Sequence, residues 1–252
     1  MEDLDAFVEK LLRDLFALPE EPMRIDLLGR RLASLSPDDG ARVIDMLYKK
    51  APRDKGARKA AEALVSPDGL KKALGTERYR LIYSASIELG LQKVSRLFTD
   101  LPPHKKGVAG YGSEEEGPME FISLGQRRSM SKRPVKETID RLLSDPDPMV
   151  VGNILNNPRT TEKEVVKIAS KRPNSPHIIK LIAVHRVWSK RYDVKKAIAL
   201  NPYSPPRVAV ALLEWMLTQD LRFISEDTTL HAQVKQGAAE ILKDRGEGRD
   251  EG

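Results

Sequence analysis

The sequence of 252 residues predicts an all-α protein in which an N-terminal helical segment is followed by a stack of helical repeats. Residues 150–169 align with residues 194–213 without a gap, so that Asn157-Pro158 falls on Asn201-Pro202. The resulting period of 44 residues is typical of repeats of two or three helices, which bury their apolar faces against neighbouring repeats. The N-terminal part instead has the three- and four-residue apolar spacing of separate amphipathic helices.

The first helix is predicted over residues 4–18, where leucine, valine and phenylalanine recur on one helical face. Pro19 and Pro22 are expected to end it, because proline removes a backbone donor. A second helix is predicted over residues 25–35 from the spacing of its isoleucine and leucines.

A third helix is predicted to begin at Ser36-Pro37-Asp38-Asp39. Serine suits the N-cap, proline suits the first helical position, and the aspartates suit the positive end of the helix dipole. Residues 66–68 repeat this signal, and a helical stretch over residues 76–98 completes the segment.

Residues 100–119 are predicted to be a flexible linker, because prolines, glycines and Glu114-Glu115-Glu116 occur there without helical or strand periodicity. The chain is therefore divided into an N-terminal helical domain (1–99), this linker, helical repeats (120–244) and a disordered tail (245–252).

The repeat region contains a second self-similarity, in which Ser-Lys-Arg-Pro at 131–134 recurs at 170–173. Residues 234–239 are a weaker third copy of the segment that begins at Val194, and we interpret them as a terminal cap. Each Asn-Pro or Arg-Pro marks a junction between helices, where the asparagine side chain can satisfy a freed backbone group. The residues expected to cap the following helices are Thr160, Ser175 and Ser204.

Two segments, Asp145-Pro146-Asp147-Pro148-Met149-Val150 and Asp193-Val194-Lys195-Lys196-Ala197-Ile198, resemble the Asp-Pro-x-Val-Arg-x-x-Ala signature of HEAT-like repeats. The Asn-Pro-x-Thr/Ser unit, with Leu124-Gly125-Gln126-Arg127-Arg128 as a lead-in, is similar to the leucine-rich-variant helical repeats of bacterial proteins. The resemblance covers about half the chain and implies an α-solenoid of HEAT-like repeats. HEAT-like families include scaffolds, regulators and DNA glycosylases, so the resemblance does not imply one function.

Positive charge is concentrated in the repeats. The net charge is +6, and residues 121–215 contain 18 basic and 8 acidic side chains. We predict a basic binding face near the repeat junctions, where stacking would bring equivalent positions into a ladder. Its candidate residues are Arg127, Arg128, Lys132, Arg133, Lys171, Arg172, Lys190, Arg191, Lys195 and Lys196.

A basic face of this kind favours an acidic protein surface or peptide as partner, including the chain's own Glu114-Glu115-Glu116 when no partner is bound. Two alternatives stay open. The charges form a solvated face without a partner, or they hold phosphates of a nucleic acid while Trp188 stacks on a base.

No catalytic, metal or cofactor site is predicted, and we interpret the protein as non-enzymatic. Cysteine is absent, and no two of the four histidines have the spacing of a metal-binding helix. A HEAT-like glycosylase would require a carboxylate such as Asp193 beside Trp188. The structural alternative is that Trp188 fills a helix junction and Asp193 caps the next helix.

The sequence also predicts a cytoplasmic protein that does not insert into a membrane. The absence of cysteine suits a reducing compartment. The N-terminus is acidic, and no apolar run approaches the length of a membrane span.

Overall fold

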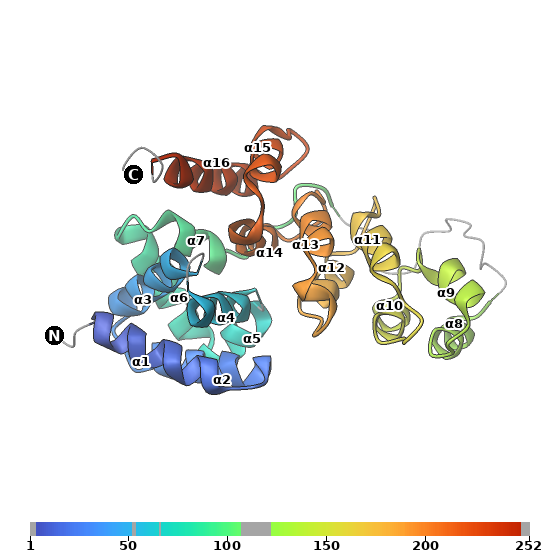
Figure 1. Cartoon of the computed structure of the whole chain (residues 1–252), viewed down its shortest axis with the longest axis horizontal. Coiled ribbons are helices and arrows are strands. Elements are labelled where there is room, and N and C mark those ends of the chain that lie inside the picture. The colour runs from blue at the N-terminus through green and yellow to red at the C-terminus, as the bar shows by residue number, and fades with distance from the viewer. Residues whose placement is uncertain (1–3, 52–53, 66, 107–121, 248–252) are drawn as a thin grey trace. The chain divides into compact units, whose positions relative to one another are not determined.

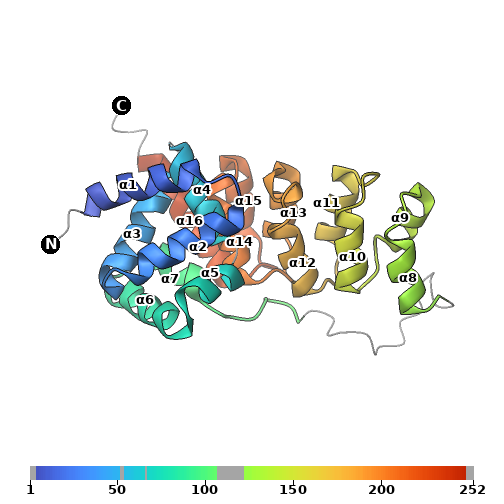
Figure 2. The same cartoon turned by 90° about the horizontal axis from the view of Figure 1, so that it is seen from below.

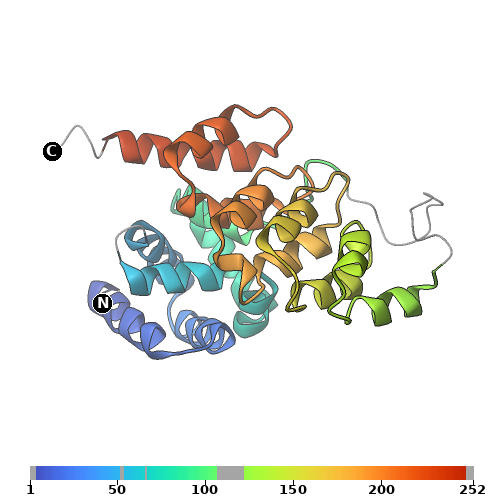
Figure 3. The ribbon, with the colours of Figure 1, turned by 45° about the vertical axis from the view of Figure 1, so that its right-hand side comes forward.

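The computed structural model describes residues 4–51, 54–65, 67–106 and 122–247. Within these residues the chain forms sixteen α-helices, two short 3-10 helices and no β-strand (Figure 1 and Figure 3). The predicted all-α class is therefore confirmed for the described part of the chain. Most of the predicted linker, including Glu114 to Glu116, lies outside the described residues.

The helices group into two compact units, one of residues 1–101, 206–225 and 232–252, and the other of residues 102–205 and 226–231. The helices of the first unit are α1 (Leu4–Ala17), α2 (Glu21–Ala33), α3 (Pro37–Lys50), α4 (Lys55–Leu64), α5 (Pro67–Leu74), α6 (Thr76–Glu88), α7 (Gln92–Phe98), α14 (Pro206–Leu212), α15 (Thr218–Glu226) and α16 (Ala232–Glu247), with the 3-10 helix η2 (Leu213–Trp215). The helices of the second unit are α8 (Leu124–Met130), α9 (Lys136–Leu142), α10 (Pro148–Leu155), α11 (Glu162–Ser170), α12 (Pro176–Ala183) and α13 (Tyr192–Ala199), with the 3-10 helix η1 (Trp188–Lys190).

This division differs from the predicted boundaries, because α14 and α16 group with the N-terminal helices. Helix α14 packs on α7 and α16. Arg96 of α7 donates to both carboxylate oxygens of Glu240 in α16, at 2.5 and 2.6 Å. Buried Arg207 of α14 donates to the Tyr79 hydroxyl of α6 at 2.5 Å. Helix α16 also continues through Glu247, so the first part of the predicted disordered tail is helical.

The start of α3 is confirmed, because Ser36 Oγ accepts a hydrogen bond from the Asp39 amide at 3.1 Å. Pro22, predicted to help end the first helix, lies instead in the first turn of α2, where proline is tolerated. The helical stretch predicted over residues 76–98 is interrupted between α6 and α7. Gly90 adopts a positive φ of 67° there, and Leu91 N donates to Ser86 O at 2.8 Å, which closes the end of α6.

The second unit has two layers of helices (Figure 2). We name them layer A, formed by α8, α10 and α12, and layer B, formed by α9, α11 and α13. Within layer A, α10 packs on both α8 and α12, and within layer B, α11 packs on α13. Their core is aliphatic and includes Ile139, Leu142, Ile154, Ile168 and Ile179, each at most 2% exposed.

Because successive helices alternate between the layers, the turns between them fall into two rows. The first turn row comprises residues 131–135, 156–161 and 184–191, which lead from layer A to layer B. The second turn row comprises residues 143–147 and 171–175, which lead from layer B to layer A, and residues 200–205, which follow α13.

Candidate binding surface

The two aligned asparagines make the same hydrogen bonds. Asn157 Nδ2 donates to Ser131 O and Arg133 O, at 3.3 and 2.9 Å. Asn201 Nδ2 donates to Ala169 O and Lys171 O, at 2.7 and 3.0 Å. Both side chains are buried. Each asparagine therefore donates to two carbonyls at or just beyond the C-terminal end of a helix, where the helix itself supplies no donor.

The residues predicted as caps beside these asparagines have another role. Thr160 Oγ1 donates to Ile154 O and Ser204 Oγ donates to Ile198 O, both at 2.6 Å. The prediction that they are N-caps is wrong, because α11 begins at Glu162 and α14 begins at Pro206. Ser175 is confirmed as a cap, since its hydroxyl accepts from the His177 amide at 3.3 Å.

Two other side chains make the equivalent bond in two further turns. Lys171, after α11, donates its Nζ to Ser144 O beyond the end of α9 at 2.5 Å. Trp188, after α12, donates its indole Nε1 to Leu155 O at the end of α10 at 2.7 Å. Four successive turns thus each bond the end of the helix two places earlier, which is the preceding helix of the same layer. These bonds tie the turns of each row together.

The 44-residue overlay relates helices of opposite layers. Helices α10 and α13 both begin and end 44 residues apart, yet α10 belongs to layer A and α13 to layer B. The two Ser-Lys-Arg-Pro copies likewise fall in different turn rows, with Lys132 and Arg133 in the first and Lys171 and Arg172 in the second. The predicted ladder of equivalent basic positions on one surface is therefore wrong.

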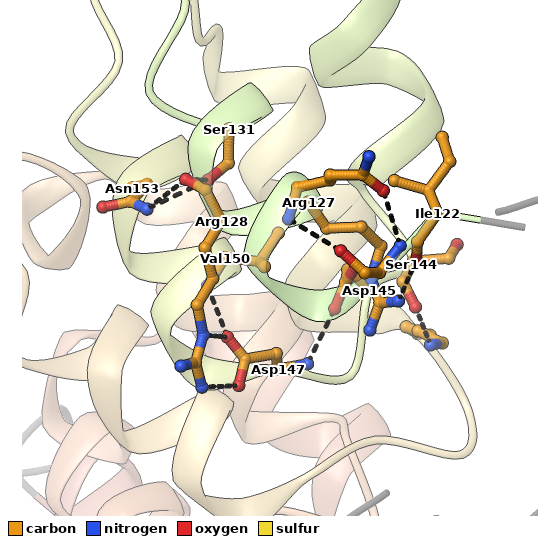
Figure 4. Close-up of polar contacts among 12 residues, drawn as sticks. Ile122, Arg127, Arg128, Ser131, Ser144, Asp145, Asp147, Val150 and Asn153 are labelled. Carbon is orange, nitrogen blue, oxygen red and sulfur yellow. Dashed lines mark hydrogen bonds and ion pairs between the residues drawn. The ribbon is translucent and has the colours of Figure 1, made fainter. Parts of the chain in front are cut away.

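Two of the predicted binding residues pair with buried aspartates of the turn between α9 and α10 (Figure 4). Arg127 Nε donates to Asp145 at 2.7 Å. Arg128 donates twice to Asp147, at 3.1 and 2.9 Å. Asp147 also accepts from the Val150 amide at 3.0 Å and thereby caps α10. The bonds from Arg128 hold the pKa of the Asp147 carboxyl below its ordinary value.

The basic residues near α12 and α13 have mixed positions. Arg172 donates to Leu200 O at 2.6 Å but is otherwise exposed. Lys190 and Arg191 are exposed in the first turn row, and Arg191 lies 3.7 Å from Glu162. On α13, Lys195 is buried and Lys196 is half-buried. Of the ten predicted residues, only Lys132, Arg133, Lys190 and Arg191 are exposed in the same turn row.

Buried carboxylates make this surface more basic than the sequence suggests. Asp145, Asp147 and Glu164 are all buried. Within residues 122–205 the exposed acidic residues are Glu137, Asp140 and Asp193. The exposed basic residues of the same segment are Lys132, Arg133, Arg141, Arg159, Lys163, Lys167, Arg172, Arg186, Lys190 and Arg191.

The sequence prediction missed Arg159 and Arg186, which are exposed in the first turn row. Each follows the C-terminal end of a layer-A helix, where a cation is favoured by the helix dipole. The sequence signal that could have identified them is a single basic residue after the last apolar position of a helix. The sequence prediction relied instead on repeated basic segments such as Ser-Lys-Arg-Pro. With them, the first turn row has six exposed cations, namely Lys132, Arg133, Arg159, Arg186, Lys190 and Arg191.

Glu164 is a buried carboxylate that the sequence analysis did not identify, and its contacts give it a structural role. It accepts from the Thr161 amide at 2.6 Å and pairs with Lys136. Burial raises the pKa of Glu164, but the bonds from Lys136 and Thr161 outweigh it and lower the pKa to about 2. The pair joins the starts of α9 and α11.

Trp188 is 9% exposed, and its only polar group is used by Leu155. The interpretation that it fills a helix junction is confirmed. Asp193 lies inside the first turn of α13 rather than at the N-cap position, which is Arg191, so its predicted capping role is wrong.

Among the described residues, no group of three or more histidine, aspartate or glutamate side chains is arranged to hold a metal ion. In that same part of the chain, no helix has both the length and the apolar character needed to cross a bilayer. Comparison with protein families, with curated proteins and with solved structures finds no significant match.

Proposed function

We propose that this protein is a non-enzymatic interaction scaffold, in which a HEAT-like α-solenoid presents a basic surface to an acidic protein partner in the cytoplasm. The observation that carries the proposal is the first turn row, where six exposed cations occur in three turns that are bonded to one another. Neighbouring helices of one layer pack about 8–10 Å apart, which sets the spacing between the turns.

The proposal rests on the rigidity of this row. Asn157 and Trp188 bond each turn to the previous helix end of layer A. Cations on a fixed framework lose less conformational freedom on binding than cations on a mobile tail. A surface of this kind is suited to selecting a partner by the positions of its carboxylates.

An acidic protein is favoured over a nucleic acid by the position of Trp188. Single-stranded nucleic acids are held by aromatic side chains on which bases stack. The ring of Trp188 is buried and its indole N–H already has an acceptor. Asp193, the carboxylate that a HEAT-like glycosylase would require, is exposed to solvent on α13.

The test is binding of a labelled poly-glutamate peptide to the full chain. We expect Arg159→Ser/Arg186→Ser/Lys190→Ser to weaken binding about tenfold, since each lost contact between exposed charges contributes up to about 1 kcal/mol. The matched control is Arg141→Ser/Lys163→Ser/Lys167→Ser, which removes equal charge from exposed positions on layer-B helices. Fluorescence anisotropy at low and high salt measures both.

The proposal fails if the two triple variants lose equal affinity, because total charge and not the first turn row would then govern binding. It also fails if a labelled oligonucleotide of arbitrary sequence binds more tightly than the peptide, with an affinity that falls linearly with salt on logarithmic axes.

A further inference from the structure

Two helices of layer A have few charged residues. Helix α10 contains no charged residue, and α12 contains two ionisable residues, exposed His177 and half-buried Lys180. A helix composed mainly of apolar residues is ordinarily buried on most of its sides. Helices α10 and α12 pack on each other and on layer B, which accounts for their buried sides but not for their outer side.

The outer side of these two helices exposes large apolar side chains. Met149 of α10 is 57% exposed, Leu181 of α12 is 37% exposed, and Val184, directly after α12, is 38% exposed. Between Met149 and the end of α10 lies Gly152, where an added Cβ atom would have no other atom within 4 Å. The outer face of layer A is therefore mainly apolar around Met149, Leu181 and Val184, with exposed His177 one turn before Leu181 and open space above Gly152.

Layer B of the same unit has the opposite character. Apart from Ser170, the exposed positions of its helices are charged, namely Glu137, Asp140, Arg141, Lys163, Lys167 and Asp193. Both layers pack against the same core, so packing in the core does not explain why their exposed side chains differ. The difference is instead explained by what each outer face contacts. Layer B is suited to water, whereas an uncharged face with large apolar side chains is typical of an interaction site.

Cations border this apolar face at one end. Helices α10 and α12 both end at the first turn row, where Arg159 follows α10, and Arg186 and Lys190 follow α12. Exposed aliphatic side chains that end in arginine and lysine are complementary to a segment with an apolar face and carboxylates beside it.

We propose that the outer face of layer A binds an acidic amphipathic helix of a partner protein. The apolar face of that helix would contact Met149, Leu181 and Val184 and enter the space above Gly152. Its carboxylates would pair with Arg159, Arg186 and Lys190. This inference rests on the proposed function and adds to it the chemical class of the partner and the second surface that the partner contacts.

The experiment uses the full chain and two labelled synthetic peptides of equal length and charge. One peptide places leucines on one helical face and glutamates on the other, and the second has serine in place of leucine. We expect Leu181→Ser/Val184→Ser to weaken the leucine peptide about tenfold, because partly exposed aliphatic area is no longer buried, and to leave the serine peptide unchanged.

A second variant guards against an effect on folding. Gly152→Glu removes no side chain, and its helical position has open space, so the fold is retained while a carboxylate enters the face. Gly152→Glu should weaken binding of the leucine peptide as strongly as the double variant does. The control Lys163→Ser/Lys167→Ser on layer B should not change the preference for the leucine peptide.

Three outcomes overturn the inference. If the leucine peptide binds both layer-A variants as it binds the wild type, the inference fails while the proposed function stands. If neither peptide binds the wild type, both fail. If phosphatidylserine vesicles bind more tightly than the leucine peptide and depend on Leu181 and Val184, the face is a membrane contact and not a protein site.

Discussion

At the scale of single residues, four side chains of three types donate hydrogen bonds at helix ends in the second unit. Asn157, Lys171, Trp188 and Asn201 each donate to a carbonyl at or just beyond the end of a helix. The donor is an amide, an ammonium or an indole group, so the position is constant while the chemistry varies. The two asparagines are identical, and this is why the sequence overlay identified them and missed the other two.

His185 supports the turn that contains Trp188. Its Nδ1 accepts from the amides of Val187 and Trp188, at 3.3 and 3.4 Å, and its Nε2 lies 3.4 Å from Asn156 Oδ1. A ring that accepts at Nδ1 is neutral and holds its proton at Nε2. Burial, and next the charge of Arg186, lower the pKa of His185 below its ordinary value.

We therefore predict that acidification destabilises the second unit through His185. As the pH falls, His185 of the unfolded chain takes up a proton near pH 6.5, whereas His185 of the folded chain does so only at a lower pH. The contribution of His185 to the free energy of unfolding is therefore complete above about pH 6.5 and is lost as the pH falls through the lower pKa of the folded state. The measurement is urea unfolding followed by Trp188 fluorescence in a Trp215→Phe background. His185→Gln should reduce the pH dependence below about pH 6.5, whereas exposed His177→Gln should not. Equal pH profiles for wild type and His185→Gln would contradict this.

At the scale of elements, the helices were predicted best where a cap and a periodic apolar face coincide. Ser36 and Ser175 start α3 and α12 as expected. Helix α4 has no such periodicity of large residues. Its buried face is formed mainly by alanines, Ala57, Ala60, Ala61 and Ala63, which carry a weak sequence signal because alanine occurs on either face of a helix.

The asparagine turns give a prediction at this scale. Asn157→Ala and Asn201→Ala should each lower the free energy of unfolding by about 1–3 kcal/mol, because two hydrogen bonds from a buried amide are lost. Asn156→Ala is the control, since Asn156 is exposed, and its effect should stay within about 0.5 kcal/mol. Urea midpoints at constant m-value measure all three. Buried asparagine variants no less stable than the control would show that water replaces the amide.

At the scale of the whole molecule, residues from the two ends of the chain form one unit. Arg96 and Glu240 are 144 residues apart in sequence and make two hydrogen bonds. The Arg96 side chain is 7% exposed, so loss of its partner leaves a buried charge. Such a loss costs much more than the loss of an exposed ion pair.

A double-mutant cycle tests this pairing. Arg96→Ala, Glu240→Ala and the double variant should give a coupling free energy of about 1–3 kcal/mol. The Asp26–Arg30 pair within α2 is the control, because both side chains are more than half exposed and such pairs contribute about 0.3–0.5 kcal/mol. Denaturant unfolding supplies each value. A coupling no larger than that of the control would mean that α16 is not held by this contact.

The sequence by itself determined the all-α class, several helix starts and the basic character of residues 121–215, because capping, apolar periodicity and charge are local properties of a chain. Only the tertiary structure decided which cations share a surface. Ion pairing of Arg127 and Arg128 with buried aspartates, and the alternation of helices between two layers, depend on residues brought together by folding. Because the repeat has three helices and successive helices alternate between two layers, equivalent residues fall in opposite layers and in different turn rows. No local sequence pattern contains that information.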